Sequence, residues 1–154
     1  MKKKTERQKL IDDCDTQFSY LIRGQQQRCE YCGKSGTLHK DTGLFIKGLD
    51  CSHTIGRGNL RLRYDPRNCR SLCSYCHKYR WHSDSAPEVK AIVDWFIKKW
   101  PEDWQYLNEV KHQPHRMTIS DFYDLLESLK TQVEALKAHK PLSDLPEVSN
   151  WTSD

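Results

Sequence analysis

The sequence predicts an α+β protein whose turn-rich middle section is held together by a metal ion and flanked by helices. Three observations support this fold class: two Cys-x-x-Cys pairs about forty residues apart, turn signals between them, and apolar residues at helical spacing on both sides. With 154 residues, of which 36% are apolar and 30% charged, the chain has the size and composition of one polar globular domain.

Residues 5–24 are predicted to form the first helix. Gly24 stands where a helix C-cap is expected, and the stretch carries one apolar stripe, which indicates a packing surface. Cys14 lies in that stripe and is expected to be a small, half-buried residue. The stripe has spacings of three and four residues and consists of Leu10, Cys14, Phe18, Leu21 and Ile22.

The middle of the chain shows turn signals rather than helical periodicity. Within 29–52, the stretches "CGKSGT" and "KDTG" flank short apolar runs, which favours a hairpin or an extended loop. Residues 53–67 mix glycines with arginines and end in an Asp-Pro turn signal, so this stretch is predicted to be an irregular loop.

Helical periodicity returns after Cys76. An apolar face at 91–100 ends at a proline, a short segment covers 102–110, and a third helix is predicted over 119–138 with Ser120 as its N-cap. The apolar stripe of the third helix indicates a core surface or a surface for a partner helix.

We expect four parts along the chain. The last of them contains two prolines and no basic residue, so it should be loosely ordered or should cross the surface as a strap. The parts are an N-terminal helix (1–28), a zinc-containing core (29–87), a C-terminal helical region (88–140) and a tail (141–154).

The cysteines predict a zinc site. No run of about 18 apolar residues is present, and the N-terminus passes from lysines directly to acids, so we expect a cytoplasmic protein that is neither secreted nor membrane-embedded. In a reducing compartment, Cys-x-x-Cys pairs are more often metal ligands than disulfides. Two unrelated pairs are one alternative; a redox pair is another, but neither pair has the strand-to-helix setting that it needs. The predicted ligands of one tetrahedral Zn²⁺ are Cys29, Cys32, Cys73 and Cys76.

Positive charge is concentrated between residues 53 and 81. This window holds seven basic residues and one acid, Asp65, which gives it a net charge of +6 against +4 for the whole chain. Arginine pairs its N–H groups with phosphate oxygens and releases counterions from nucleic acid, so the window favours a phosphate-contacting surface; a solvated face without a role is the alternative. The expected DNA contacts are Arg57, Arg61, Arg63, Arg67, Lys78 and Arg80.

The order of these residues resembles the ββα-metal (HNH) nuclease motif with an integral zinc. Between the cysteine pairs lie "LDCSHTIGRG" and "PRNCRSLC", and a histidine follows the last cysteine. The resemblance implies that zinc joins a hairpin to a helix, that His53 is the general base, that Asn68 supports the loop and that His77 binds a catalytic divalent ion. The alternatives are structural: a hydrogen-bonded or zinc-linked His53, a simple turn residue at 68, and a helix-capping or phosphate-binding His77.

Phosphodiester hydrolysis explains these residue types. A base must reach a water molecule, and a hard cation must stabilise charge on the phosphate and the leaving oxygen. An imidazole such as that of His53 titrates near neutral pH and can therefore accept a proton. Thiolates suit Zn²⁺, whereas imidazole, carboxylate and water suit Mg²⁺ or Mn²⁺. One position departs from the motif, because Ser52 stands where most members carry a metal-binding Asp or His. Asp50, on the same face of a strand, or His82 could supply that ligand, Asp50 directly or through a water molecule.

The chain also resembles the NinG (Rap) recombination proteins of lambdoid phages over residues 14–137. The shared stretches are "FSYLIRGQQQRCEYCG", "LRYDPRNCRSLCSYCH" and "HRMTISDFYDLLESLK", and in that family the residue before the histidine is also small. The insert between Cys32 and His53 is longer here. The resemblance implies a phage-encoded endonuclease that acts in the bacterial host cytoplasm on branched DNA, such as D-loops and Holliday junctions.

Three functions of different classes fit the sequence. A metal-dependent DNA endonuclease explains the motif and the charge together, whereas a zinc-stabilised DNA-binding recombination accessory protein without catalysis is favoured by Ser52 alone. A protein-interaction adaptor that uses the helices at 88–138 leaves the charge unexplained.

A homodimer with its interface on the C-terminal helix would match the two-fold symmetry of a junction. Tyr79 and Trp81 could stack on exposed bases or pack beneath the zinc site.

Overall fold

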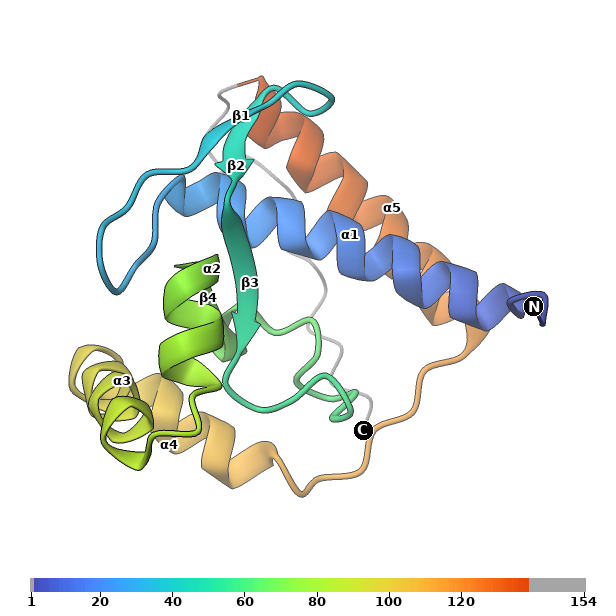
Figure 1. Cartoon of the computed structure of the whole chain (residues 1–154). Coiled ribbons are helices and arrows are strands. Elements are labelled where there is room, and N and C mark those ends of the chain that lie inside the picture. Colours follow the sequence, from blue (N-terminus) through green and yellow to red (C-terminus); the bar gives the residue numbers. More distant parts are fainter. Residues whose placement is uncertain (1, 139–154) are drawn as a thin grey trace.

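The computed structural model describes residues 2–138, so the predicted tail at 141–154 lies outside the described residues. Helices α1 (Glu6–Gln26) and α5 (Ile119–Lys137) lie side by side at one end of the molecule, and α3 (Ala86–Lys99) and α4 (Pro101–Val110) lie at the other (Figure 1). Between them lie two small antiparallel sheets, so the fold is α+β as predicted. Within this described part, no helix is both long and apolar enough to cross a membrane.

Helix α1 extends beyond the predicted boundary at Gly24. Its N-terminus is capped by Thr5, and it ends at Gln27, which takes the left-handed conformation with φ of 57°. The prediction of Gly24 as the C-cap was therefore wrong. This glycine lies inside the helix, where an added Cβ would stand 2.6 Å from Leu136 Cδ2, so its small size allows α5 to approach.

Helix α5 packs its apolar stripe onto α1. The helix begins after Thr118, whose side chain and that of Asp121 form a capping box, so the predicted N-cap Ser120 was wrong by two positions. The stripe belongs to the same buried cluster as Leu10, Cys14 and Phe18 of α1, and Cys14 is fully rather than half buried. Because the stripe is core within the chain, it is not available as the interface of a dimer.

The middle of the chain contains four short strands. Strands β1 (Thr37–His39) and β2 (Leu44–Lys47) form a hairpin, in agreement with one of the two expectations for this stretch. Strand β3 (Leu49–His53) pairs antiparallel with β4 (Cys69–Cys73), so that His53 lies opposite Cys69. The loop at 54–68 joins them and contains only a short 3₁₀ turn, Pro66–Asn68.

A helix follows β4 directly and completes a ββα arrangement. Helix α2 (Ser74–Cys76) continues as a π-helical turn at His77–Trp81 (Figure 1). Ile92 of α3 is buried with Leu49, Leu72 and three of the four zinc-site cysteines, whereas Phe96 joins Leu62 in a separate cluster with α4. The helices at 86–110 therefore support the far side of the ββα unit and leave its other side facing α1.

Candidate active site

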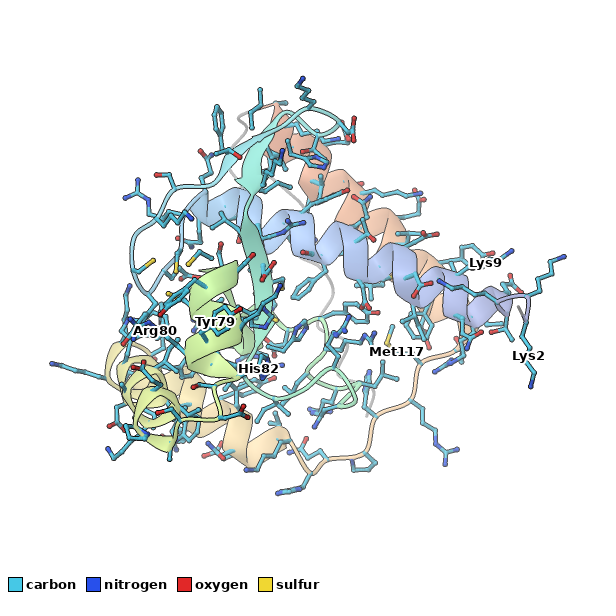
Figure 2. The ribbon with its side chains drawn as sticks, viewed as in Figure 1. Lys2, Lys9, Tyr79, Arg80, His82 and Met117 are labelled. Atoms are coloured by element: carbon cyan, nitrogen blue, oxygen red, sulfur yellow. The ribbon has the colours of Figure 1, made fainter. Side chains whose placement is uncertain are left out.

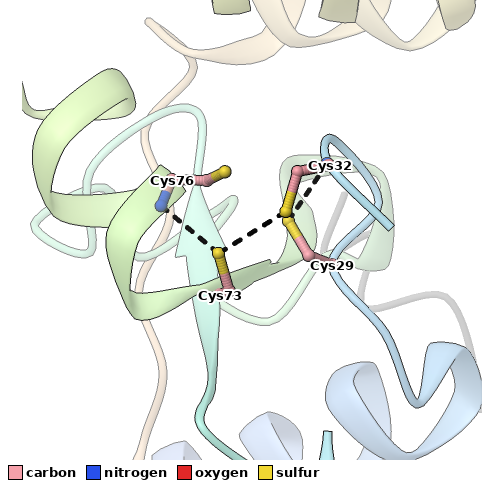
Figure 3. A group of neighbouring side chains, drawn as sticks. All are labelled: Cys29, Cys32, Cys73 and Cys76. Atoms are coloured by element: carbon pink, nitrogen blue, oxygen red, sulfur yellow. Dashed lines mark hydrogen bonds between the residues drawn. The ribbon is translucent and has the colours of Figure 1, made fainter. Parts of the chain in front are cut away.

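The four predicted zinc ligands come together at the junction of β4 and α2. Cys73 and Cys76 thus do stand at a strand-to-helix junction, contrary to the expectation from sequence, and it is the closeness of all four sulfurs that favours a metal site over a redox pair. The four sulfur atoms all lie within 4.8 Å of one another, and three of the four residues are buried (Figure 3). Each Cys-x-x-Cys pair is a tight turn in which the second cysteine's backbone N–H points at the first sulfur, at 3.5 Å for Cys32 to Cys29 and 3.4 Å for Cys76 to Cys73. These N–H groups would stabilise thiolates.

The geometry of this cluster fits Zn²⁺. Zinc–sulfur bonds of about 2.3 Å in a tetrahedron place neighbouring sulfurs about 3.8 Å apart. The Sγ atoms of Cys32 and Cys73, one from each pair, are 3.7 Å apart. Four thiolates form a closed site with no position for substrate, so the residues suit a structural zinc.

His53 lies at the end of β3, and its hydrogen bonding fixes its tautomer. Its Nε2 donates to the backbone carbonyl oxygen of Arg63 at 2.9 Å, and a carbonyl oxygen can only accept. In the neutral ring, the lone pair is therefore on Nδ1. Burial lowers the pKa of His53 below its ordinary value, opposed in part by the bond to Arg63. The ring is thus neutral and able to accept a proton at pH 7.

Asn68 ties the irregular loop to the start of β4. The residue is fully buried, its Oδ1 accepts from the Ile55 N–H at 2.7 Å, and its Nδ2 donates to the carbonyl oxygens of Ile55 at 2.9 Å and Leu62 at 3.0 Å. These bonds hold both halves of the loop that supplies the Arg63 carbonyl to His53. Asn68 therefore acts on His53 only indirectly.

Asp50 and His77 form a second polar group beside His53. Asp50 Oδ2 lies 3.1 Å from His77 Nδ1, which joins β3 to the helix that follows the zinc site. The rings of His77 and His82 have their centroids 4.9 Å apart. Partial burial, followed by the neighbouring His77, lowers the pKa of His82 below its ordinary value. Ser52 is only 2% exposed and does not line the cleft, so its hydroxyl is poorly placed to serve as a ligand.

His53, Asp50, His77 and His82 all line one cleft of about 690 Å³. Figure 2 shows His82 on the side of its helix nearer β3 and Arg80 on the opposite side. His53 and His77 face the cleft from different elements, and α1 forms its third wall. The polar and charged residues that line it are Asp15, Ser19, Arg23, Asp50, His53, Arg57, His77, Lys78 and His82.

The contribution of α1 to the cleft was not predicted from the sequence. Asp15, Ser19 and Arg23 all line the cleft, although α1 was expected only to pack. Their spacing of four residues places them on one face of the helix, beside the apolar stripe. That polar stripe is the signal that could have identified them.

The structure separates the six expected DNA contacts into two groups. Arg57 and Lys78 line the cleft and are exposed, and Arg63 lies just behind it, held by Asp15 through two short bonds of 2.6 and 2.8 Å. The others lie away from the cleft lining: Arg61, Arg67 and Arg80.

Much of the positive charge in the basic window is paired. Arg67 forms an ion pair with Asp65 and lies 3.4 Å from the centre of the Tyr106 ring, while Arg80 pairs with Glu88. Arg70 is buried against Asp103. Arg57 at the cleft also lies 3.6 Å from Asp15, so Lys78 is the cleft-lining basic residue of the window that forms no ion pair within the described residues.

Comparison with known proteins gives one match. Residues 29–80 match the family model of HNH endonucleases, a stretch that includes both cysteine pairs, β3, β4 and the helix that carries His77. No curated protein and no solved structure matched the chain.

Proposed function

We propose, from the HNH endonuclease domain formed by residues 29–80, that the chain is a metal-dependent endonuclease that hydrolyses DNA with His53 as general base. One observation carries the proposal. The Nε2 of His53 is committed to the Arg63 carbonyl, and the ring faces the same cleft as the Asp50–His77 pair. A base and a pair of hard-metal ligands on one cleft are what metal-assisted hydrolysis requires.

Asp50 and His77 suit a divalent cation of the Mg²⁺ or Mn²⁺ type. Neighbouring ligands of an octahedral ion at about 2.1 Å are about 3.0 Å apart, and the carboxylate oxygen and ring nitrogen here are 3.1 Å apart. His82 could provide a third ligand. The bound ion would supply charge stabilisation at the scissile phosphate and the leaving oxygen.

The other steps of the proposed reaction are assigned to side chains and backbone groups of the protein. His53 Nδ1 takes the proton of the attacking water, while the Arg63 carbonyl holds the ring in the required tautomer and Asn68 holds the loop. Arg57 and Lys78 bind the phosphates that flank the scissile bond. The zinc cluster keeps His77 in place, because Cys76 directly precedes it.

The finer assignment follows the resemblance to the NinG proteins. We propose that the substrate is branched DNA, such as a Holliday junction or a D-loop, and that the protein is phage-encoded and acts in the cytoplasm of a bacterial host. A homodimer would allow paired cuts on a two-fold symmetric junction, but its interface must lie elsewhere than on the buried stripe of α5.

The direct test is cleavage by the purified, zinc-loaded chain. Labelled linear duplex and a four-way junction are incubated with Mg²⁺, Mn²⁺ or EDTA. We expect cutting with a divalent ion and none with EDTA, and the junction should be cut faster than the duplex. Equal rates on the two DNAs would overturn the branched-substrate assignment and leave the nuclease.

A DNA-binding accessory protein without catalysis is the second candidate. The observation that favours it is Ser52, which stands where a metal ligand is expected and is buried. Binding of both DNAs with no cutting under any of these ions would establish this alternative.

A further inference from the structure

Two thiols stand beside the proposed base and have no part in the mechanism. Cys51, His53 and Cys69 offer ligand atoms that all lie within 4.8 Å of one another. Strand register explains this: His53 lies opposite Cys69 across the β3–β4 pair, and Cys51 lies two residues before His53 on the same face of β3. These residues are separate from the four cysteines of the structural zinc site.

The donor set has a clear chemical preference. Two thiolates and an imidazole suit Zn²⁺ and other soft or borderline ions, whereas Mg²⁺ prefers oxygen ligands. The ring nitrogen that remains for a metal is Nδ1, because Nε2 donates to Arg63. A metal bound here would therefore occupy the same lone pair that the proposed reaction uses to accept a proton.

We infer that Cys51, His53 and Cys69 form a second, exchangeable Zn²⁺ site that blocks the base when it is filled. Three protein ligands leave a fourth position open, unlike the closed site of four cysteines. Cys51 and His53 line the cleft, so an ion can enter from solvent. Metal binding at this site does not depend on the proposed function, whereas the inhibition of cleavage rests on it.

Cobalt titration followed by optical absorption tests the binding directly. The chain is first loaded with one equivalent of Zn²⁺, which fills the four-cysteine site, and Co²⁺ is then added under anaerobic, reducing-agent-free conditions. Thiolate-to-cobalt absorption in the near ultraviolet requires a bound thiolate, so Co²⁺ held by Asp50 and His77 does not produce it. We expect this absorption to saturate at one further equivalent.

Variants assign the signal to this site. Cys51→Ser and His53→Gln should weaken Co²⁺ binding at least tenfold, and Cys51→Ser should lose about half of the thiolate absorption. Cys14→Ser is the matched control, because Cys14 is a buried cysteine outside both clusters and should leave the titration unchanged. Circular dichroism checks that each variant is folded.

The outcomes separate this inference from the nuclease proposal. Absence of thiolate absorption in the zinc-loaded wild type, or its persistence at full strength in folded Cys51→Ser, overturns the site whatever the cleavage assay shows. If the site is present and the nuclease is active, micromolar excess Zn²⁺ should slow cleavage in Mg²⁺ by tenfold or more. Undiminished cleavage with the site filled would overturn the blocking role.

Discussion

The hydrogen bond from His53 Nε2 to the Arg63 carbonyl decides which ring nitrogen can act as a base. The chain also buries the ring, which lowers its pKa below 6.5. A base must be neutral, so kcat/KM for cleavage should be level above pH 6.5 and should fall as pH decreases through the lowered pKa. A pH–rate profile at saturating Mg²⁺ measures this.

The control for the pH profile is His112→Gln, a histidine outside the cleft, which should leave the acid limb in place. An acid limb with its midpoint above pH 6.5 would contradict the assignment, because it would require a group whose pKa is raised.

Asn68 should matter through stability first. Asn68→Ala removes three hydrogen bonds, so the Ile55 N–H and carbonyl lose their Asn68 partners, whereas the Leu62 carbonyl keeps its bond from the Asp65 N–H. We expect the free energy of unfolding to fall by about 2–4 kcal/mol. Urea denaturation of the zinc-loaded protein measures it. Asn108→Ala, on the partly exposed side of α4, should cost less than about 1 kcal/mol, and equal losses would refute the special role of Asn68.

At the residue scale, local spacing predicted more than charge did. The sequence singled out the four cysteines and both histidines, and the structure brings the four sulfurs together and places His53 and His77 on one cleft, whereas the roles of these residues stay predictions. Of the expected phosphate contacts, three pair with acids outside the basic window: Arg57 and Arg63 with Asp15, and Arg80 with Glu88. A count of charges along the sequence contains no information on such distant pairs.

Among the elements, we expect the helix after β4 to depend most on zinc, because it begins at one predicted ligand and contains another. Cys32→Ser should reduce bound zinc well below one equivalent and lower the melting temperature, although Cys32 itself is exposed. Zinc content by atomic absorption and melting followed by circular dichroism measure both effects. Cys51→Ser should retain the structural zinc, and an unchanged melting temperature in zinc-free Cys32→Ser would show that the metal does not support the fold.

The helices were predictable as elements, but their ends were not. Periodicity located α1 and α5, yet their ends depend on the capping boxes of Thr5 and Thr118 and on the left-handed Gln27. Gly24 resembled a cap in sequence because glycine also serves where helices pack closely. The short strands β1 and β2 give only weak periodicity, so one hairpin could not be separated from an extended loop.

Across the whole molecule, we expect the unpaired charge of Lys78 at the cleft to contribute to DNA binding. Lys78→Ala should reduce the slope of log binding constant against log salt by about 1, because the ammonium group is exposed at the cleft. Arg67→Ala is the matched control: its guanidinium is also exposed but pairs with Asp65, so its slope should change little. Binding is measured from 50 to 200 mM salt; equal changes in the two variants would contradict a cleft-centred DNA surface.

The third wall of the cleft is a property of the whole molecule that local motifs do not contain. Asp15 and Arg63 are bonded at 2.6 Å although 48 residues separate them, and this pair joins α1 to the loop that orients His53. The pairing depends on how α1 packs across β3. The apolar stripe of α1 predicts that the helix packs, but not that it forms a wall of the cleft.

Single-turnover cleavage of labelled DNA by wild type and His53→Ala tests the central claim most directly. Both proteins are assayed in Mg²⁺ after zinc content and DNA affinity have been matched. Loss of the general base should slow cleavage by about 10²–10⁴-fold while zinc and DNA binding remain. A His53→Ala variant that cuts at the wild-type rate would show that another group activates the water and that His53 is structural.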